Sequence, residues 1–188
     1  SGIYGADRGD ERLDESSALG SDFLGRMGTQ WEASADPARA VGIRVAHPRF
    51  GMILGRGGAL QRMLPFFRLG LGGRLGSGRN WMCWISLEDA VRAVRFAIEH
   101  HDLDGPFNAV APEPVTNTTF TGELGRALHR PTPWVVPRLA LDLLFGEMAE
   151  GTVLASQKVY PDRLLQAGFE HRHPQLGQAL AAVFGSGD

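Results

Sequence analysis

The sequence predicts an α/β protein, because strand-like and helix-like segments alternate along its 188 residues. The clearest helix signal lies at 87–100, where apolar residues recur at helical spacing. The clearest strand signals are the short apolar runs 81–85 and 107–111. With 43% hydrophobic residues, the chain can bury a core of its own, as one compact domain or as one domain with part of another.

The N-terminal third predicts a loop, a helix and two extended runs. Residues 1–18 are rich in glycine and acidic residues, which is typical of an exposed loop. A Ser-Asp pair can cap a helix over 21–35. Apolar and polar residues alternate over 41–46, which indicates a strand, and the apolar run 51–55 follows it.

The next segment surrounds a glycine-rich run. Residues 59–69 have helical periodicity, and Pro65 is expected to break or kink this helix. The run 70–78 contains five glycines and invites interpretation as a phosphate loop. A dinucleotide fingerprint needs a strand before the glycines and a helix after them, whereas here the order is reversed. The phosphate-loop interpretation is therefore the minor one.

The remaining elements are mostly helical. Ser86 caps the helix 87–100, and a helix over 117–128 follows the strand 107–111 and a loop at 112–116. Beyond these lie a short predicted strand at 134–136 and four predicted helices, at 139–148, 152–159, 161–167 and 174–184.

Composition excludes several classes of function. A formal net charge of -2 argues against duplex nucleic acid as a partner, since such binding depends on basic side chains. Cys83 is the only cysteine, so an internal disulfide is impossible and a reducing, cytoplasmic setting is expected. No apolar run is long enough to span a membrane. The histidine clusters at 100–101 and 171–173 lack further ligands at suitable spacing, so no metal site is expected.

Several motifs, taken together, resemble those of the extended short-chain dehydrogenases/reductases, the nucleotide-sugar epimerase group. They are Ser1-Gly2-Ile3-Tyr4-Gly5 with Asp14-Glu15-Ser16, Pro48 to Gly55, Gly76 to Asp89, and Phe107-Asn108. A closer similarity is to the uncharacterised "epimerase family" branch, carried by 63–73, 111–117 and 164–169. The resemblance implies the C-terminal part of a Rossmann-type fold with a mostly helical substrate lobe, and NADP or NAD as cofactor, bound mostly upstream of Ser1.

Important positions depart from the family pattern. The family's Tyr-x-x-x-Lys pair, which moves the proton, falls near Leu24 and Gly28. Lys158 is the only lysine, so this chain cannot supply that pair. Met52 and Met82 stand where the family has an asparagine and a diphosphate-binding arginine, and a thioether is not a phosphate ligand. These two departures weaken the expectation, implied by the family name, that the substrate is a nucleotide sugar.

Catalytic and cofactor candidates follow from these motifs. The resemblance places Ser1 near the family's catalytic serine, and His47 lies beside Pro48 where an acid/base histidine is plausible. A structural histidine remains the alternative for His47. Arg49, Phe50 and Gly51 are predicted to contact the cofactor, and the alternative for Arg49 is a salt-bridged arginine.

Substrate contacts are predicted beside the glycine-rich run. Arg79 and Asn80 offer donors, and Trp81 offers an aromatic pocket wall. Two functions follow. The first is an NAD(P)-dependent oxidoreductase or epimerase-like protein acting on a small carbonyl or sugar-like molecule. The second is a cofactor-binding regulatory or partner-binding protein that has lost catalysis.

The resemblance also predicts how the chain is organised. Residues 1–136 are expected to form the C-terminal part of the Rossmann-like domain with substrate-lobe segments, and 137–188 a helical tail. Helices that flank an incomplete sheet would leave an apolar face and a strand edge uncovered. We therefore expect the N-terminal half of the same protein, or a neighbouring chain, to complete the structure.

Overall fold

The computed structural model describes residues 2–136 and 155–185, and it confirms the α/β class. The helices are η1 (Gly2–Tyr4, 3-10), α1 (Phe23–Ala33), α2 (Asp36–Ala40), α3 (Gly58–Arg68), α4 (Leu87–Glu99), α5 (Asn117–Ala127), α7 (Asp162–Gln166) and α8 (Leu176–Phe184). The strands are β1 (Asp7–Leu13), β2 (Ala46–Phe50), β3 (Met52–Leu54), β4 (Gly73–Leu75), β5 (Trp81–Met82), β6 (Trp84–Ser86), β7 (Gly105–Ala109), β8 (Val115–Thr116), β9 (Trp134–Val136) and β10 (Ser156–Val159).

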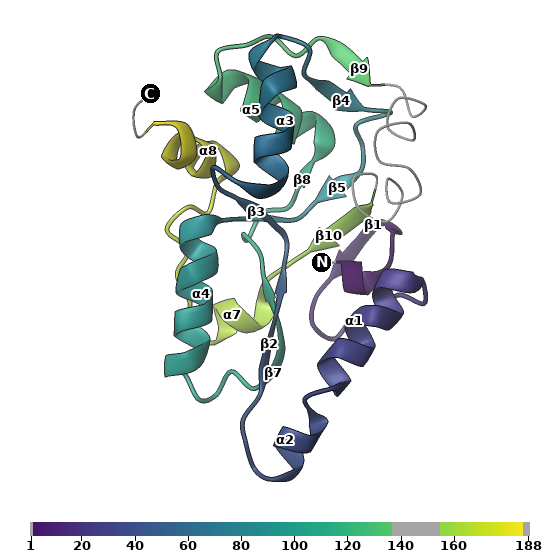
Figure 1. Ribbon diagram of the computed structural model, residues 1–188, viewed down its shortest axis with the longest axis vertical. Coiled ribbons are helices and arrows are strands. Elements are labelled where there is room, and N and C mark those ends of the chain that lie inside the picture. The colour runs from purple at the N-terminus through teal and green to yellow at the C-terminus, as the bar shows by residue number, and fades with distance from the viewer. Residues whose placement is uncertain (1, 137–154, 186–188) are drawn as a thin grey trace.

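The strands pair in two-stranded ribbons, most of them parallel. The parallel pairs are β1 with β10, β2 with β7, β3 with β6, and β4 with β9, while β5 pairs antiparallel with β8. Parallel neighbours need long crossover connections, so each ribbon joins distant parts of the chain. Figure 1 shows β2 and β7 in the middle of the lower half, with α4 on one side and α1 on the other.

Apolar packing holds these layers together. Ala90, Ala93 and Ala97 of α4 pack on the β2–β7 ribbon through Phe107 and Ala109. In the upper half of Figure 1, α3, α5 and α8 enclose a second cluster around the buried Trp84. A third cluster surrounds Tyr4, the last residue of η1.

The predicted helix starts are confirmed where a side chain caps the first turn. Asp22 accepts from the amide of Gly25 at 2.8 Å, and Ser86 accepts from the amide of Asp89 at 3.0 Å. The helix α3 continues through Pro65, so that residue does not end it.

Several predicted elements are wrong. Residues 7–13 form a strand rather than a loop, and 156–159 form a strand rather than part of a helix, because these two segments pair with each other in parallel. The predicted strand at 41–46 is displaced to 46–50, where β7 is its partner. The glycine-rich run and the predicted loop at 112–116 contain the short strands β4 and β8. The predicted helix 139–148 lies outside the described residues.

Candidate functional site

The candidate site lies at the carboxyl ends of β2 and β7, which is where parallel α/β sheets bind ligands. Phe50 and Ala109 are paired at this end of the ribbon, and Gly51 follows β2 directly. A Cβ on Gly51 would lie 2.8 Å from the backbone carbonyl of Cys83, which explains why a glycine is needed here. The three predicted cofactor residues, Arg49, Phe50 and Gly51, thus lie at or next to the ligand-binding end, and their contact with a cofactor stays a prediction.

Arg49 is buried and holds two protein partners. Its Nε and Nη2 atoms donate to the two carboxylate oxygens of Glu32 on α1, at 2.7 and 2.8 Å. Its Nη1 donates to the hydroxyl of Tyr4 at 3.0 Å. Burial acts to lower the pKa of Arg49, but the bonds to Glu32 and Tyr4 outweigh it and keep that pKa above its usual value. Such a bidentate pair fixes α1 against β2.

Tyr4 extends this network into β7. Its hydroxyl donates to Oδ1 of Asn108 at 2.7 Å, and Nδ2 of Asn108 donates to the carbonyl of Tyr160 at 2.9 Å. The amide of Asn108 donates to Glu15 at 2.8 Å. Burial raises the pKa of Tyr4, and burial also raises the pKa of Glu15. We refer to Glu32, Arg49, Tyr4, Asn108 and Glu15 as the buried network.

The buried network connects η1, α1, β2 and β7. Tyr4 and Asn108 have no exposed surface in the described structure. The Tyr4 hydroxyl has one donor and one acceptor partner, so its hydrogen-bonding capacity is largely used. Sequence reasoning placed Tyr4, Glu15 and Asn108 in family motifs but did not join them. It missed Glu32, since an acidic residue on a helix is an ordinary surface feature.

Leu24 and Gly28, near which the sequence predicts the family's Tyr-x-x-x-Lys positions, pack against η1. A Cβ added at Gly28 would lie 2.9 Å from Cγ1 of Ile3. A Cβ added at Gly2 would lie 3.0 Å from Cδ1 of Leu24. The helix α1 therefore uses Leu24 and Gly28 to approach η1 closely, and a long polar side chain at residue 28 would collide with Ile3.

Trp81, the predicted pocket wall, lies between two charged side chains. Its indole Nε1 donates to Asp10 at 2.7 Å, and the Lys158 ammonium lies 4.3 Å from its ring centroid. Its backbone amide donates to the hydroxyl of Ser156 at 3.1 Å. The only lysine of the chain thus contacts an aromatic ring far along the chain from α1.

Asn80 and Arg79 carry side-chain N–H donors and precede Trp81 in the chain. The Nδ2 atom of Asn80 is buried and has no hydrogen-bond partner among the described residues. The carbonyl of Asn80 accepts from the amide of Asn117 at 2.9 Å, which fixes the residue in place. Arg79 is exposed, and its backbone amide donates to the hydroxyl of Ser77 at 3.3 Å. These contacts leave two side-chain donors beside Trp81.

Of the two catalytic candidates, the described residues include His47 alone. Ser1 lies outside the described part of the chain. His47 is in β2 opposite Pro106, three positions before Phe50, and so nearer the amino end of the strand. Its ring has no hydrogen-bond partner within 2–136 and 155–185. A catalytic role for either residue stays a prediction.

The C-terminal segment is attached through Asp89 of α4. Asp89 is fully buried and accepts from the backbone amides of Arg172 and His173, at 2.8 and 2.9 Å. Burial favours a higher pKa for Asp89, but these bonds and one from Arg92 outweigh it and hold the pKa below its usual value. His171 donates from Nε2 to the carbonyl of Val110 at 2.8 Å, and burial lowers the pKa of this histidine.

The described residues contain neither a candidate metal site nor a candidate membrane span. No three histidine, cysteine or acidic side chains there gather as metal ligands. No helix in that part of the chain combines the length and the apolarity needed to cross a membrane.

Comparisons with known proteins agree on one family. Residues 136–183 match the family model described as a domain of unknown function, DUF1731. An epimerase family protein of Mycobacterium bovis is 46% identical over 180 residues, which cover 95% of this chain and 60% of the relative. A relative from Staphylococcus epidermidis is 42% identical over 160 residues, covering 85% of this chain and 53% of that protein. The chain therefore spans 60% or less of these relatives' length.

Solved structures show the same relationship. The human epimerase family protein SDR39U1, solved with NADPH, has a TM-score of 0.89 and 35% identity over 97% of this chain and 62% of that chain. A nucleoside-diphosphate sugar epimerase from Corynebacterium glutamicum has a TM-score of 0.75 and 36% identity, covering 98% of this chain and 36% of that one. A UDP-glucose 4-epimerase from Thermotoga maritima shares the fold alone, with a TM-score of 0.74 and 16% identity over 97% of this chain and 59% of its own. The chain is similar to epimerase family proteins over most of its own length, and its fold is the Rossmann-type fold of the extended short-chain dehydrogenases/reductases.

Proposed function

We propose that the chain is part of an NAD(P)-dependent oxidoreductase or epimerase-like protein that acts on a small carbonyl or sugar-like substrate. The observation that carries this proposal is the fold shared, at 35% identity, with a human relative solved with NADPH. Most of the cofactor site would lie in the part of the family fold that this chain does not span. The chain itself would supply the end of β2 and the substrate side.

Two of the three predicted cofactor residues are placed where they can contact a dinucleotide. Phe50 and Gly51 are half-buried at the carboxyl end of β2, so they can contact a dinucleotide from the sheet. Arg49 does not fit a phosphate ligand, because Glu32 and Tyr4 engage its guanidinium. We assign Arg49 a positioning role. When bound, the dinucleotide would supply or accept the hydride, and the chain's own residues would orient the substrate.

Substrate contact is assigned to the donors beside Trp81. A buried amide without a partner costs about 1–3 kcal/mol, and a ligand oxygen on Nδ2 of Asn80 would remove that cost. The exposed guanidinium of Arg79 can approach the same molecule from solvent. Donors of this kind suit carbonyl and hydroxyl oxygens. The proton must come from a group other than the usual tyrosine, and Ser1, His47 and water are the candidates.

The packing of Leu24 and Gly28 favours a second candidate function. Because α1 approaches η1 closely at these positions, a lysine of the pair at residue 28 would require Ile3 to shift. A protein that binds NADP without catalysis, and responds to it by binding a partner, would need no such group.

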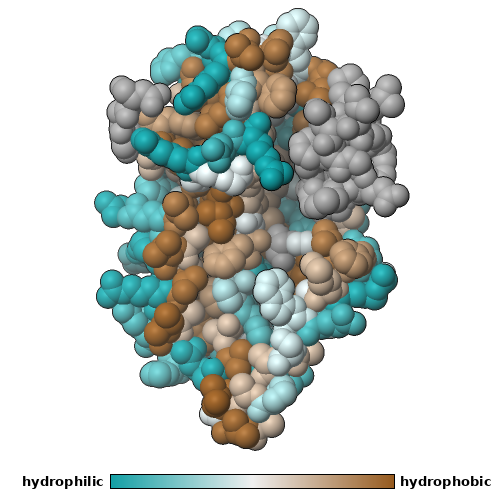
Figure 2. Space-filling model, in the orientation of Figure 1, coloured by the Kyte–Doolittle hydropathy of each residue, from teal (hydrophilic) through white to brown (hydrophobic). Residues whose placement is uncertain are grey.

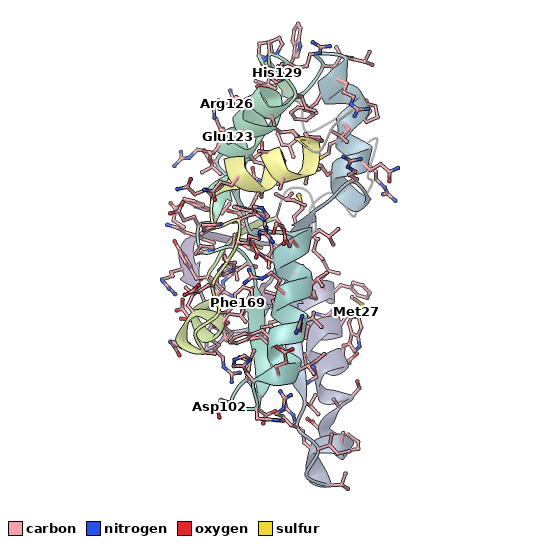
Figure 3. All side chains as sticks on the ribbon, turned by 90° about the vertical axis from the view of Figure 1, so that its left-hand side faces the viewer. Met27, Asp102, Glu123, Arg126, His129 and Phe169 are labelled. Carbon is pink, nitrogen blue, oxygen red and sulfur yellow. The ribbon has the colours of Figure 1, made fainter. Side chains whose placement is uncertain are left out.

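Turnover measurements separate the two functions. The protein is assembled from this chain and the part of the Mycobacterium bovis relative that the chain does not match, and NADPH consumption is followed over a panel of carbonyl compounds and nucleotide sugars. If the protein is an enzyme, Asn80→Ala should lower turnover. Arg126→Ala is a control on the outside of α5 (Figure 3) and should leave turnover unchanged. Tight NADPH binding with no turnover across the panel would instead establish the second function.

A further inference from the structure

We propose that one end of the molecule docks on an anionic phospholipid surface. The C-terminal ends of α3 and α5 lie there together with β4 and β9 (Figure 1). We call this end the tip and define it by its exposed apolar side chains, Phe66, Leu69, Leu71, Trp134 and Val135. The inference goes beyond the proposed function and does not rest on it, because the candidate site includes none of these five residues.

Hydrogen bonds hold the two segments of the tip together. The strand β4 pairs in parallel with β9, and Gly73 is the partner of Trp134. The indole Nε1 of Trp134 donates to the carbonyl of Gly70 at 2.8 Å, and Nε of Arg130 donates to the carbonyl of Arg68 at 2.9 Å. The five apolar side chains therefore belong to one surface, and the polar atom of the indole is already satisfied.

The apolar side chains of the tip project into solvent. Leu69 is 74% exposed, and Leu71 and Trp134 are each 56% exposed. Figure 2 shows hydrophobic side chains at the upper end of the molecule, with hydrophilic side chains beside them. The β2–β7 ribbon, which the N-terminal half is expected to complete, lies in the lower half of Figure 1. An apolar surface gathered away from that ribbon marks a site of interaction.

Arginines dominate the charge of the segments that form the tip. Residues 56–80 and 116–136 contain seven arginines and one acidic residue, Glu123, whereas the whole chain has a formal net charge of -2. Figure 3 shows Glu123 and Arg126, which pair with each other, at this end of the molecule. The exposed side chain of Arg62 has no hydrogen-bond or ion-pair partner among the described residues. The tip therefore combines projecting apolar side chains with positive charge.

This combination fits an anionic phospholipid surface. Apolar and aromatic side chains enter the boundary between headgroups and acyl chains, and binding strengthens with the buried apolar area and with electrostatic attraction. The stems of arginine side chains can cover apolar surface while their guanidinium groups bind phosphate. A lipid surface accommodates projecting side chains of any shape, whereas a protein partner needs complementary packing against each of them. Docked in this way, the tip lies on a bilayer and does not cross it.

Other occupants satisfy only part of the tip. Two tips of a homodimer would bring arginines of like charge together, which opposes association. An acidic protein would neutralise the arginines but would offer no acyl layer to Leu69 and Trp134. An anionic lipid surface satisfies both kinds of side chain at once.

Vesicle co-sedimentation tests the docking of the tip. The full chain is incubated with vesicles of phosphatidylcholine alone and with vesicles of phosphatidylcholine and phosphatidylglycerol in equal parts. We expect binding to the anionic vesicles and not to the neutral ones. Raising the salt concentration should weaken the binding, because salt screens the attraction between guanidinium and phosphate groups.

Variants inside and outside the tip locate the contact. Leu69→Glu should weaken binding about tenfold or more, because it places a charge in the apolar contact. Arg62→Ala should weaken it about fivefold, the factor expected for one basic residue at an anionic surface. Ile98→Glu and Arg95→Ala are the matched controls on α4, where Ile98 is 67% exposed, and they should leave binding unchanged.

Tryptophan quenching identifies the inserted side chain. Bromine atoms on the acyl chains of the phosphatidylcholine quench the fluorescence of tryptophans that enter the bilayer. We expect Trp134→Phe to remove the quenching and Trp31→Phe, at an exposed position of α1, to retain it. This measurement needs no charge substitution, so it remains decisive if Leu69→Glu fails to fold.

Each other outcome overturns the docking of the tip. No binding, equal binding to both kinds of vesicle, or equal weakening by Leu69→Glu and Ile98→Glu contradicts it. Quenching that Trp31→Phe removes assigns the contact to α1 instead. Binding to soluble polyglutamate, with none to vesicles, replaces the lipid surface by an acidic protein.

Discussion

The guanidinium of Arg49 donates a hydrogen bond to the hydroxyl of Tyr4 at 3.0 Å and so connects β2 to η1. The same guanidinium pairs with Glu32 on α1, and the same hydroxyl donates to Asn108 on β7. One arginine therefore fixes three elements at the carboxyl end of the ribbon. A group held in this way shapes the site through its neighbours, because three of its N–H groups have protein partners.

Replacing Arg49 tests this positioning role. Arg49→Met should lower the free energy of unfolding by about 3–5 kcal/mol, because it leaves the Glu32 carboxylate without its buried partner. Urea unfolding measures the change. The double variant Arg49→Met/Glu32→Leu should recover much of the loss, since neither charge remains. A single variant as stable as the original protein would show that the pair contributes nothing.

The close approach of α1 to η1 predicts opposite effects of alanine at two helical glycines. Gly28→Ala should destabilise the protein by about 1–3 kcal/mol, because its Cβ would lie 2.9 Å from Ile3. Gly122→Ala on α5 meets nothing within 4 Å and should stabilise by up to about 1 kcal/mol through helix propensity. Thermal unfolding compares the two. Stabilisation by Gly28→Ala would disprove the close contact.

Burial of His171 predicts a loss of stability in mild acid. Its folded-state pKa is lowered by burial, so the unfolded chain takes up a proton at a higher pH than the folded one. The contribution of neutral His171 to the free energy of unfolding is complete above the unfolded-state pKa of about 6.5. It is lost as the pH falls below that value. Urea unfolding between pH 8 and pH 5 should show a steeper acid-side decline for the original protein than for His171→Gln. Parallel curves would contradict the prediction.

Truncation of two asparagine side chains, Asn108 and Asn80, should change the free energy of unfolding by different amounts. Asn108→Ala removes bonds to Tyr4 and Tyr160 and should cost about 2–4 kcal/mol. Asn80→Ala removes a buried amide that has no partner among the described residues, so the free energy of unfolding should stay within about 0.5 kcal/mol or rise. Denaturant unfolding of both variants provides the comparison. A large loss in Asn80→Ala would reveal a structural role and remove the argument for a substrate contact.

Local signals in the sequence predicted most of the helices and several strands, such as the one at 107–111, and failed for β1 and β10, which pair with each other. Ser86 and Asp22 cap their own first turns, so α4 and α1 could be located from neighbouring residues. The strand β1 is almost entirely exposed and has no apolar alternation, and it is a strand because β10 pairs with it. No pattern within either segment carries that information.

The candidate site divides in the same way. Family motifs drew attention to Tyr4, Asn108 and Arg49, but their mutual bonds arise only when η1, β7 and β2 meet. Charge and spacing could not reveal that Arg49 is committed to Glu32. The alternative of a salt-bridged arginine, left open from the sequence, describes the geometry that the structure shows.

The most direct test of the account is an equilibrium titration with NADPH, followed by nucleotide fluorescence. The titration compares the chain alone with the chain assembled with the remainder of a family relative. We expect the assembled protein to bind NADPH saturably and the chain alone not to bind it. The variant Arg95→Ala, changed on the outside of α4, should retain the binding of the assembled protein. Absence of binding by the assembled protein, or equal binding by the chain alone, would contradict it.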